Sequence, residues 1–432
     1  MYLRRLWFLA RLRTTPWQPK KKIEYLQEKK LYLLLRYAYL NVGYYHDLFN
    51  SARINLSPGS ALEELKNVPL TTKQNLISAG IDKIFSNPQK MNRCIKKFTS
   101  GSSGEPFEIY LRKKDYDALA ALTIRNYKIN GLGLYSRRIE IGSPDTIEGG
   151  ESIFNKLGFW RTRNLSVHLK MEDMSGLINA YRPDAIVAYP SALKQLCQYI
   201  IDNKINIFKP RCLFCRSEFL DAETRVLAKR AFGVDIFDFF GCWEIGLFAF
   251  ECKEHLGYHL SQDACLTEFI GINGKAAAEG EISRIVCTNF YSYAMPFVRY
   301  DIGDMGSYSS EPCRCGIRFP RLSRIMGRAD DCIVLRSGEK VLPSTVILSF
   351  KDILGISKYR IVQEDTANLT VSLQLSEQQK NEPHGIVQKV ASNMHQIFRG
   401  KINVRVEISD YLKSNAGEKY KSIISKINQG FN

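Results

Sequence analysis

A loop of glycine and hydroxyl residues is the first part of the sequence whose composition suits a chemical task. It lies between an expected strand at residues 95–98 and an extended segment at residues 107–111, and it contains Thr99, Ser100, Gly101, Ser102, Ser103 and Gly104. Small residues let the backbone curl until its N–H groups point at a phosphate. No lysine follows the glycines and no helix follows at once, so this is not the GxxxxGK[ST] loop. The loop indicates phosphate binding, and a plain polar hairpin turn is the alternative.

Three later segments carry charged side chains just beyond expected strands. Glu244 lies in the turn of Asp238–Gly246, Asp304 ends the segment Arg299–Asp304, and Arg328 follows a glycine. Structural roles can also account for these residues. Glu244 or Asp304 can cap a helix or a turn, and Arg328 can sit in a surface ion pair.

The elements that must position these residues follow an α/β pattern. From residue 94 onward, apolar strands alternate with helical patterns, which is the signature of a sheet with crossover helices. Residues 279–288 and 295–300 are expected as strands of a second, more antiparallel layer. The strands of the first layer are predicted at residues 138–141, 185–188, 212–215 and 235–240, with helices at residues 116–130, 192–204 and 222–232.

A change of pattern predicts a second domain. After Gly327 the chain turns to short strands and hairpins around one helix, which is typical of a compact α+β unit of about 100 residues. We therefore expect two domains, residues 1–329 and 330–432, and a basic helical lead-in at residues 1–45. The elements expected in the small domain are strands at 332–335, 359–363, 369–375 and 403–408 and a helix at 385–398.

Charge and cysteine content narrow the class of protein. The 432 residues include 61 Lys and Arg against 44 Asp and Glu, and this net charge of +17 favours an anionic partner. Residues 1–36 hold ten basic and two acidic residues beside Trp7 and Trp17, a mixture that suits an anionic membrane surface or a solvated docking helix. The longest apolar runs are too short for a membrane span. Eleven scattered cysteines indicate reduced thiols, so we expect a cytoplasmic protein. Nucleic-acid binding is disfavoured, because no recognition motif is visible.

Taken together and in order, these motifs resemble those of the adenylate-forming acyl ligases. Within that superfamily the sequence is similar to the phenylacetate-CoA ligase and capsular-polysaccharide-biosynthesis branch, from residues 31–39 and 68–73 through to the end. The resemblance implies a large N-terminal α/β domain and a small, mobile C-terminal α+β domain. It also implies an enzyme that adenylates a carboxylic acid with ATP, releases pyrophosphate, and passes the acyl group to a thiol, usually that of coenzyme A.

The resemblance also implies roles for individual residues. Oriented N–H donors, a divalent cation and a cationic side chain help to bring two anions together. The loop from Thr99 to Gly104 would cradle the β- and γ-phosphates, and Glu244 would hold Mg²⁺. Asp330 would be the hinge on which the small domain turns. The remaining nucleotide contacts would come from Ser217 and Glu218 on the adenine side, Phe240 and Gly241 against the base, Asp304 on the ribose hydroxyls, and Arg328 on ribose or phosphate.

Two departures from the family pattern concern the reacting groups. The family places a glycine directly before its catalytic lysine, whereas Glu418 separates Gly417 from Lys419 in this chain. Alignment on the Lys-aromatic-Lys segment selects Lys419 to bridge the carboxylate and the α-phosphate, with a solvated basic tail as the alternative. Trp243 stands where many relatives carry a hydroxyl residue, so the identity of the acid is not carried over from phenylacetate ligases.

Three cysteines and a histidine predict a structural zinc site. Cys252 and His259 follow the Glu244 turn, and Cys313 and Cys315 share a later loop. Three thiolates and one imidazole can form a closed tetrahedral site. Some relatives carry a similar arrangement, and their register favours His259 over His255. Free thiols are the alternative.

We weigh three functions. The first is an AMP-forming acid–CoA ligase that uses ATP, Mg²⁺ and coenzyme A. The second keeps adenylation but delivers the acyl group to an amine, a hydroxyl or a carrier thiol in surface-polysaccharide or natural-product assembly. The third is a non-catalytic relative that binds polyanions or membranes.

Overall fold

The computed structural model divides the chain into two compact units. It describes residues 2–99, 107–143, 158–271, 273–350, 353, 355–376, 379, 383–412 and 422–427, without the side chains of residues 2, 330, 344 and 348. The first unit contains Met1–Glu281, Ile285–Ile302 and Ser307–Ser323, and the second contains Ile282–Arg284, Gly303–Gly306 and Arg324–Asn432. The domain boundary at residue 330 and the hinge role of Asp330 stay predictions.

Helices form the start of the first unit. The longest, α2 (Lys20–Asn41), buries Leu31, Leu34, Leu35 and Ala38, whose spacing of three and four residues places them on one face. It ends because Val42 is extended, and a new helix begins at the next residue. The other elements of this part are α1 (Tyr2–Leu12), η1 (Thr15–Trp17), α3 (Gly43–Ser51), α4 (Ala61–Asn67), α5 (Lys73–Ala79), α6 (Ile81–Ile84) and η2 (Pro88–Arg93).

A hairpin and a long helix follow. Strands β1 (Ile95–Thr99) and β2 (Phe107–Leu111) pair antiparallel with Thr99 opposite Phe107, so the predicted phosphate loop connects the two strands. Helix α7 (Lys113–Ile129) begins directly after β2. None of the helices in the described part of the chain has both the length and the apolar run that crossing a bilayer requires.

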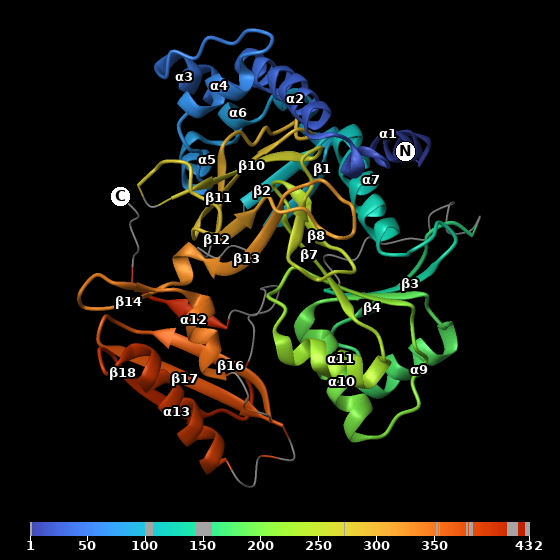
Figure 1. The fold of residues 1–432 in the computed structure, drawn as a ribbon, viewed down its shortest axis with the longest axis vertical. Helices are drawn as coiled ribbons and strands as arrows, with labels where there is room; N and C mark the ends of the chain where they lie inside the picture. The colour runs from blue at the N-terminus through green and yellow to red at the C-terminus, as the bar shows by residue number, and fades with distance from the viewer. Residues whose placement is uncertain are drawn as a thin grey trace. The chain divides into compact units, whose positions relative to one another are not determined.

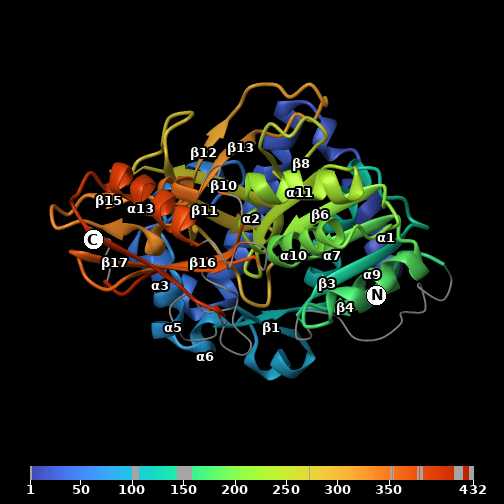
Figure 2. The ribbon, with the colours of Figure 1, turned by 90° about the horizontal axis from the view of Figure 1, so that it is seen from below.

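Eleven of the described strands form one sheet (Figure 1). Five of its strands are parallel, namely β3 (Arg137–Gly142), β4 (Arg161–Ser166), β5 (Ala185–Ala188), β6 (Cys212–Arg216) and β7 (Ile236–Cys242). Helices α9 (Met171–Tyr181), α10 (Pro190–Asp202) and α11 (Ala222–Phe232) lie beside these strands in Figures 1 and 2 and share one apolar core with them. The predicted α/β class is confirmed.

The prediction of a separate antiparallel layer is wrong. Strand β9 pairs with β13, and this pairing joins the later strands to the same sheet in the order β10-β11-β12-β13-β9-β8-β7-β6-β5-β3-β4. Residues 295–299 form no strand, since Pro296 has no N–H to donate, and the strand starts at Tyr300 instead. These strands are β8 (Gly246–Glu251), β9 (Tyr258–Leu260), β10 (Cys265–Ile270), β11 (Ser283–Asn289), β12 (Tyr300–Ser309) and β13 (Arg321–Arg328).

The second unit has its own sheet and core. Its strands run in the order β18-β17-β16-β19, and alternate residues of β17 point into an apolar core that is closed by one face of α13. Its elements are η3 (Ala329–Asp331), β14 (Ile333–Val334), β15 (Lys340–Val341), α12 (Pro343–Ile347), η4 (Leu348–Phe350), β16 (Ile356–Gln363), β17 (Asn368–Leu375), α13 (His384–Phe398), β18 (Asn403–Ile408) and β19 (Ile423–Ser425).

Candidate active site

Glu244 occupies a tight turn between two strands of the sheet. Cys242 of β7 pairs with Gly246 of β8, so the turn between them is short. The Glu244 residue is only 7% exposed, and its carboxylate accepts a 3.0 Å hydrogen bond from the hydroxyl of Tyr300. The Asn289 side chain donates to the Glu244 carbonyl oxygen at 2.8 Å, which holds the backbone of the turn. The turn therefore fixes one carboxylate oxygen by a side-chain donor, and a carboxylate held this way can coordinate a cation.

Gly241 is required by the close approach of β7 and β8. A Cβ atom at this position would lie 2.1 Å from the carbonyl oxygen of Gly246 and 2.8 Å from the Cα of Leu247. Both neighbours are backbone, and the strand register shifts between Phe240 and Gly241. A side chain here would push apart the two strands that carry the Glu244 turn.

We predict that Gly241→Ala lowers the free energy of unfolding by about 3 kcal/mol or more, because the new methyl group collides with backbone that cannot move aside. Urea unfolding followed by circular dichroism measures the effect. Gly176→Ala is the matched control, since a Cβ at Gly176 in α9 meets no atom within 4 Å. The control should be neutral or slightly stabilising, as for other glycines in helices. Equal stability of the two variants would contradict the packing argument.

A lysine and a tryptophan connect the hairpin with the turn. The ammonium group of Lys97 on β1 lies 4.8 Å from the centre of the Trp243 ring, a distance typical of a cation–π contact. Two residues further on, the Thr99 hydroxyl accepts a 3.3 Å hydrogen bond from the Phe107 N–H and closes the end of the hairpin. The strand that precedes the predicted phosphate loop therefore contacts the Glu244 turn through Lys97 and Trp243. Residues Ser100–Gly104 themselves lie outside the described residues.

The predicted adenine-side residues lie on or directly after two neighbouring parallel strands, β6 and β7. Ser217 comes directly after β6 with a positive φ of 75°, a conformation that is uncommon for a residue other than glycine and that clusters at functional sites. Phe240 lies on β7 and packs edge-on against Phe248, with ring centres 5.4 Å apart. The Glu218 carboxylate accepts from the Ser191 N–H at the start of α10, so this residue has a capping role in the described structure.

Asp304 and Arg328 belong to the second unit. They lie on β12 and β13, which are neighbours in the sheet. The Arg328 guanidinium packs against Gly303, where a Cβ would be 2.6 Å from its Nη2 atom, and the positive φ of 78° at Gly303 also favours glycine. The structure thus places Arg328 beside the residue that precedes Asp304. The backbone of Asp330 forms part of η3, and Lys419 lies outside the described residues.

The four predicted zinc ligands converge. The Sγ atoms of Cys252, Cys313 and Cys315 and a ring nitrogen of His259 all lie within 4.8 Å of one another. Cys315 Sγ lies 3.3 Å from His259 Nε2, and the sulfur atoms of Cys252 and Cys313 are 3.7 Å apart. His259 Nδ1 lies 3.2 Å from the Phe319 carbonyl oxygen, which turns Nε2 toward the sulfur atoms. Burial lowers the pKa of His259 to about 4, so its ring is neutral near pH 7.

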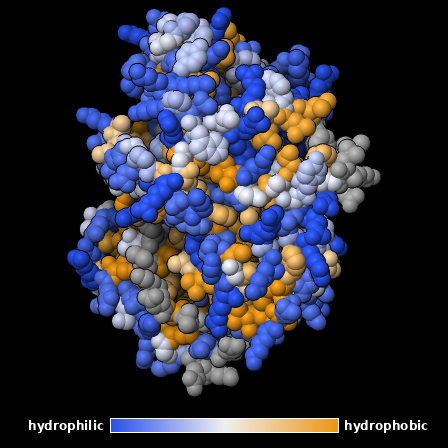
Figure 3. Space-filling view, turned by 45° about the vertical axis from the view of Figure 1, so that its right-hand side comes forward, coloured by the Kyte–Doolittle hydropathy of each residue, from blue (hydrophilic) through white to orange (hydrophobic). Residues whose placement is uncertain are grey.

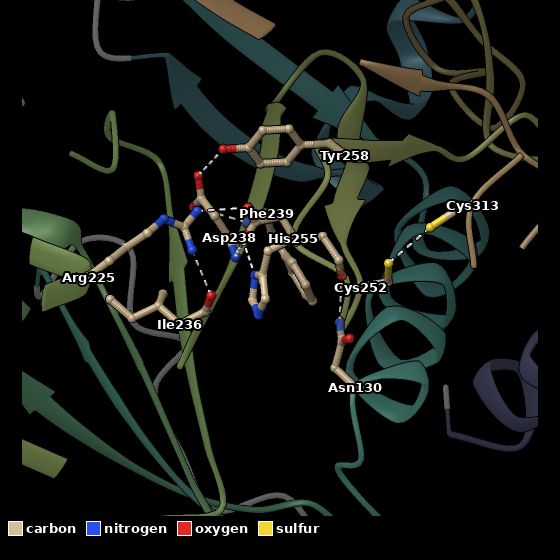
Figure 4. A network of polar contacts seen from close by, with 10 residues as sticks. Asn130, Arg225, Ile236, Asp238, Phe239, Cys252, His255, Tyr258 and Cys313 are labelled. Atoms are coloured by element: carbon tan, nitrogen blue, oxygen red, sulfur yellow. Dashed lines mark hydrogen bonds and ion pairs between the residues drawn. The ribbon is translucent and has the colours of Figure 1, made fainter. Parts of the chain in front are cut away.

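Figure 4 shows His255 in one polar network with Asp238, Cys252 and Cys313, but its ring contacts other side chains than the cysteines. Its Nδ1 lies 3.5 Å from a carboxylate oxygen of Glu251, and its ring stacks on Phe237. The other oxygen of Glu251 accepts from the Arg225 guanidinium at 2.7 Å. Among the described residues, the metal-ligating group contains His259 and not His255.

Asp238 is the buried centre of this network. Its carboxylate accepts a 2.7 Å hydrogen bond from the Tyr258 hydroxyl and a 3.0 Å bond from the Phe239 N–H. Burial, the largest cause, raises the pKa of Asp238 from 3.8 to about 8. The folded protein therefore favours the protonated form of this carboxyl group at neutral pH.

We predict that Asp238→Asn makes the free energy of unfolding depend less on pH. Between about pH 4 and pH 8 the folded state holds a proton that the unfolded state has released, so raising the pH lowers the free energy of unfolding, by at most about 1.4 kcal/mol per pH unit. Asparagine removes this titration. Urea unfolding at pH 5, 6.5 and 8 measures the slopes, and Asp235→Asn, at an exposed carboxylate paired with Lys229, is the control. Identical slopes for the wild type and Asp238→Asn would refute the prediction.

Sequence reasoning missed three residues that shape the site. Tyr300, Asn289 and Lys97 hold the Glu244 turn and its tryptophan, but only the charged end of the Arg299–Asp304 segment drew a functional assignment. Tyr300 lies in that same segment and is the first residue of β12. A tyrosine four residues before the predicted site residue Asp304 was the available signal in the sequence.

Comparison with known proteins finds relatives along most of the chain. The chain is 26% identical over 370 residues to a phenylacetate-coenzyme A ligase of Thermus thermophilus, covering 80% of this chain and 79% of that protein. It is 24% identical over 423 residues to the protein CapK of Staphylococcus aureus, covering 93% and 89%. No family model matches the chain.

The fold is also that of a known ligase structure. A crystal structure of 2-hydroxyisobutyryl-CoA ligase in the postadenylation state, with an acyl-AMP bound, superimposes with a TM-score of 0.77 at 18% identity and covers 93% of this chain and 89% of that one. Along most of its length the chain is thus similar to phenylacetate-coenzyme A ligases and to CapK, and it shares its fold with 2-hydroxyisobutyryl-CoA ligase.

Proposed function

We propose that this protein is an ATP-dependent, AMP-forming carboxylic acid ligase that delivers the acyl group to coenzyme A. The observation that carries the proposal is the Glu244 turn, where a buried carboxylate held by Tyr300 sits beside the hairpin that leads into a Ser/Gly loop. The phenylacetate-coenzyme A ligases among the relatives supply the reaction class.

Two displacement reactions make up the proposed activity. In the first, a carboxylate oxygen of the acid attacks the α-phosphorus of ATP, and the bond to pyrophosphate breaks to leave acyl-AMP. In the second, the thiolate of coenzyme A attacks the acyl carbon, and AMP leaves to give the thioester. In both, catalysis rests on positioning the reactants and stabilising negative charge.

The residues of this chain divide that task. The N–H groups of residues 99–104 would hold the β- and γ-phosphates, and Glu244 would hold Mg²⁺, which neutralises phosphate charge. Asp304 would accept from the ribose hydroxyls, and Lys419 would stabilise the charge shared between the acid and the α-phosphate. Ser217, Glu218, Phe240 and Gly241 would surround the adenine, and Arg328 would bind ribose or phosphate.

ATP–pyrophosphate exchange with a panel of aryl, fatty, amino and hydroxy acids tests the first reaction. Exchange that depends on one class of acid is the expected result. Trp243 stands in this turn where many relatives carry a hydroxyl residue, so the panel does not assume that phenylacetate is the acid. Absence of exchange with every acid would instead support the non-catalytic, polyanion- or membrane-binding alternative.

A second candidate differs in the acceptor. The resemblance to the capsular-polysaccharide-biosynthesis branch implies transfer to an amine, a hydroxyl or a carrier thiol, and the chain matches CapK over 93% of its own length. Adding coenzyme A to the adenylation reaction separates the two. Formation of a thioester supports the first candidate, and an acyl-AMP that coenzyme A does not consume supports the second.

A structural zinc ion is part of the proposal, since three thiols and a neutral imidazole suit tetrahedral coordination. We predict about one zinc ion per purified chain, and less than about 0.2 in Cys315→Ser, with a lower unfolding temperature, because metal binding stabilises the folded state. Elemental analysis and calorimetry measure both effects. Cys94→Ser, outside the cluster, should keep its zinc. A wild-type chain purified without zinc, and unaffected by the Cys315 change, would exclude the site.

We place the reaction in the cytoplasm. All eleven cysteines are free thiols, the state that a reducing compartment maintains. Association of residues 1–36 with an anionic membrane also stays a prediction.

A further inference from the structure

Helix α1 is held against α7 by its inner face (Figure 1). Phe8, Leu9 and Leu12 are buried in one apolar cluster with Ala118, Ala121 and Leu122 of α7. At the start of the helix, Arg4 and Arg5 both donate to the carboxylate of Asp117, at 2.6 and 2.8 Å, and the side chain of Asp117 is fully buried.

The chain is also held beyond the end of the helix. The carbonyl oxygen of Pro16 accepts a 2.8 Å hydrogen bond from the N–H of Arg318. Because contacts hold the chain at the start of α1 and just beyond its end, the helix has a defined orientation. The face that points away from α7 is therefore defined as well.

That outer face is apolar, which is unusual for an exposed helix. Leu3 is 82% exposed, Leu6 39% and Trp7 51%, and Ala10 is exposed as well. Their spacing of three and four residues puts all four on one side of the helix. Hydrophobic side chains reach the surface in several places, as the orange groups among blue residues in Figure 3 show. On α1 the exposed apolar side chains instead form a continuous row along one helix, and an apolar row of this kind marks an interaction surface.

The charged residues in and just after α1 are mostly basic, although Glu24 pairs with Lys20 at 3.8 Å. Residues 1–23 contain seven Lys and Arg and no Asp or Glu. Arg4 and Arg5 are engaged with Asp117, whereas Arg11, Arg13 and Lys20–Lys22 are exposed. Arg11 lies over the Trp7 ring at 4.7 Å, directly beside the apolar row. Lys30 does not belong to this exposed basic group, because it is only partly exposed and donates to the Tyr291 hydroxyl and the Asp263 carbonyl oxygen.

We propose that the outer face of α1, formed by Leu3, Leu6, Trp7 and Ala10, binds the surface of an anionic lipid bilayer. An apolar row with tryptophan and flanking cations is typical of helices that lie in the membrane interface. Eleven residues span only about 16 Å, so α1 lies on the bilayer and does not cross it. A symmetric contact between two copies is disfavoured, since it would bring two basic segments together, each with Arg11 beside the apolar row.

Vesicle sedimentation with the full-length chain tests the proposal, and it needs no ligase activity. We expect binding to vesicles of phosphatidylcholine with 30% phosphatidylglycerol at low salt, and little binding to phosphatidylcholine alone. Leu6→Glu/Trp7→Glu should lower the partition coefficient by about tenfold or more. Arg11→Glu/Arg13→Glu should do the same through charge, at about fivefold per lost cation.

A matched control distinguishes loss of the apolar face from the general effect of two added negative charges. Val226→Glu/Tyr135→Glu introduces the same two negative charges at positions that are each 65% exposed but far from α1 in sequence, and it should bind as the wild type does. Circular dichroism and thermal unfolding establish that each variant is folded. Equal loss in the control, or no preference for anionic vesicles in the wild type, would overturn the proposal. So would a dimer in solution that Leu6→Glu/Trp7→Glu dissociates, because the face would then be a protein interface.

Discussion

Replacing Glu244 with glutamine is expected to lower the rate of acyl-adenylate formation by about a hundredfold or more, while the protein stays folded. Glutamine has the shape of glutamate and can still accept the hydrogen bond from Tyr300, but it loses the negative charge that holds a divalent cation. Removing one preorganised electrostatic contact at a reacting centre typically costs a factor of about 10²–10³. ATP–pyrophosphate exchange at saturating ATP and magnesium measures this rate.

The control for Glu244→Gln is Glu63→Gln, which removes an exposed carboxylate that pairs with Lys66 on the surface of α4. This control should keep the wild-type rate. Titrating magnesium adds a second readout, since a weakened cation site should need a higher magnesium concentration for half-maximal exchange. Wild-type exchange and an unchanged magnesium requirement in Glu244→Gln would remove this residue from the proposed site.

Replacing Lys419 with alanine is expected to lower adenylation by about 10²–10³, because the ammonium group stabilises charge that develops between the acid and the α-phosphate. Thioester formation from chemically prepared acyl-AMP and coenzyme A should stay within a few-fold of wild type, since that half-reaction begins after the lysine has acted. Measuring the two half-reactions separately gives a readout that general loss of structure would not produce.

Lys421→Ala is the matched control, two residues away on the same segment. Retained adenylation in Lys419→Ala together with its loss in Lys421→Ala would move the catalytic role to Lys421. If both variants adenylated normally, the segment would be a solvated basic tail. Loss of both half-reactions in Lys419→Ala would also count against the proposed role.

Regular elements with strong patterns were predictable. The strands at residues 185–188 and 212–215 are short apolar runs, and they appear as β5 and β6 with those same bounds or one residue more. The helix at residues 222–232 coincides with α11, which has an aspartate cap and ends at a glycine with positive φ. Local sequence determines such elements because capping, turn chemistry and apolar periodicity agree.

Strand β12 was missed for a physical reason. Its sequence from Asp301 to Gly306 holds two glycines and two aspartates, a composition that argues against a strand. Pairing with neighbouring strands in the large sheet compensates for that low propensity, and Asp301 N–H also bonds to the Thr71 carbonyl oxygen far away in sequence. Contacts of this kind depend on the whole fold, and a local pattern does not contain them.

By itself, the sequence determined the chemical inventory of this protein: a Ser/Gly loop, an acidic turn, a cysteine–histidine set and a basic N-terminus. Only the tertiary structure decided how these groups are used. It brought Cys252, His259, Cys313 and Cys315 within 4.8 Å, set Tyr300 on Glu244, and turned the apolar row of α1 outward while Asp117 engaged two of its cations. The sequence lists the residue types, but the distances between residues that are far apart in sequence are set only when strands pair and helices pack.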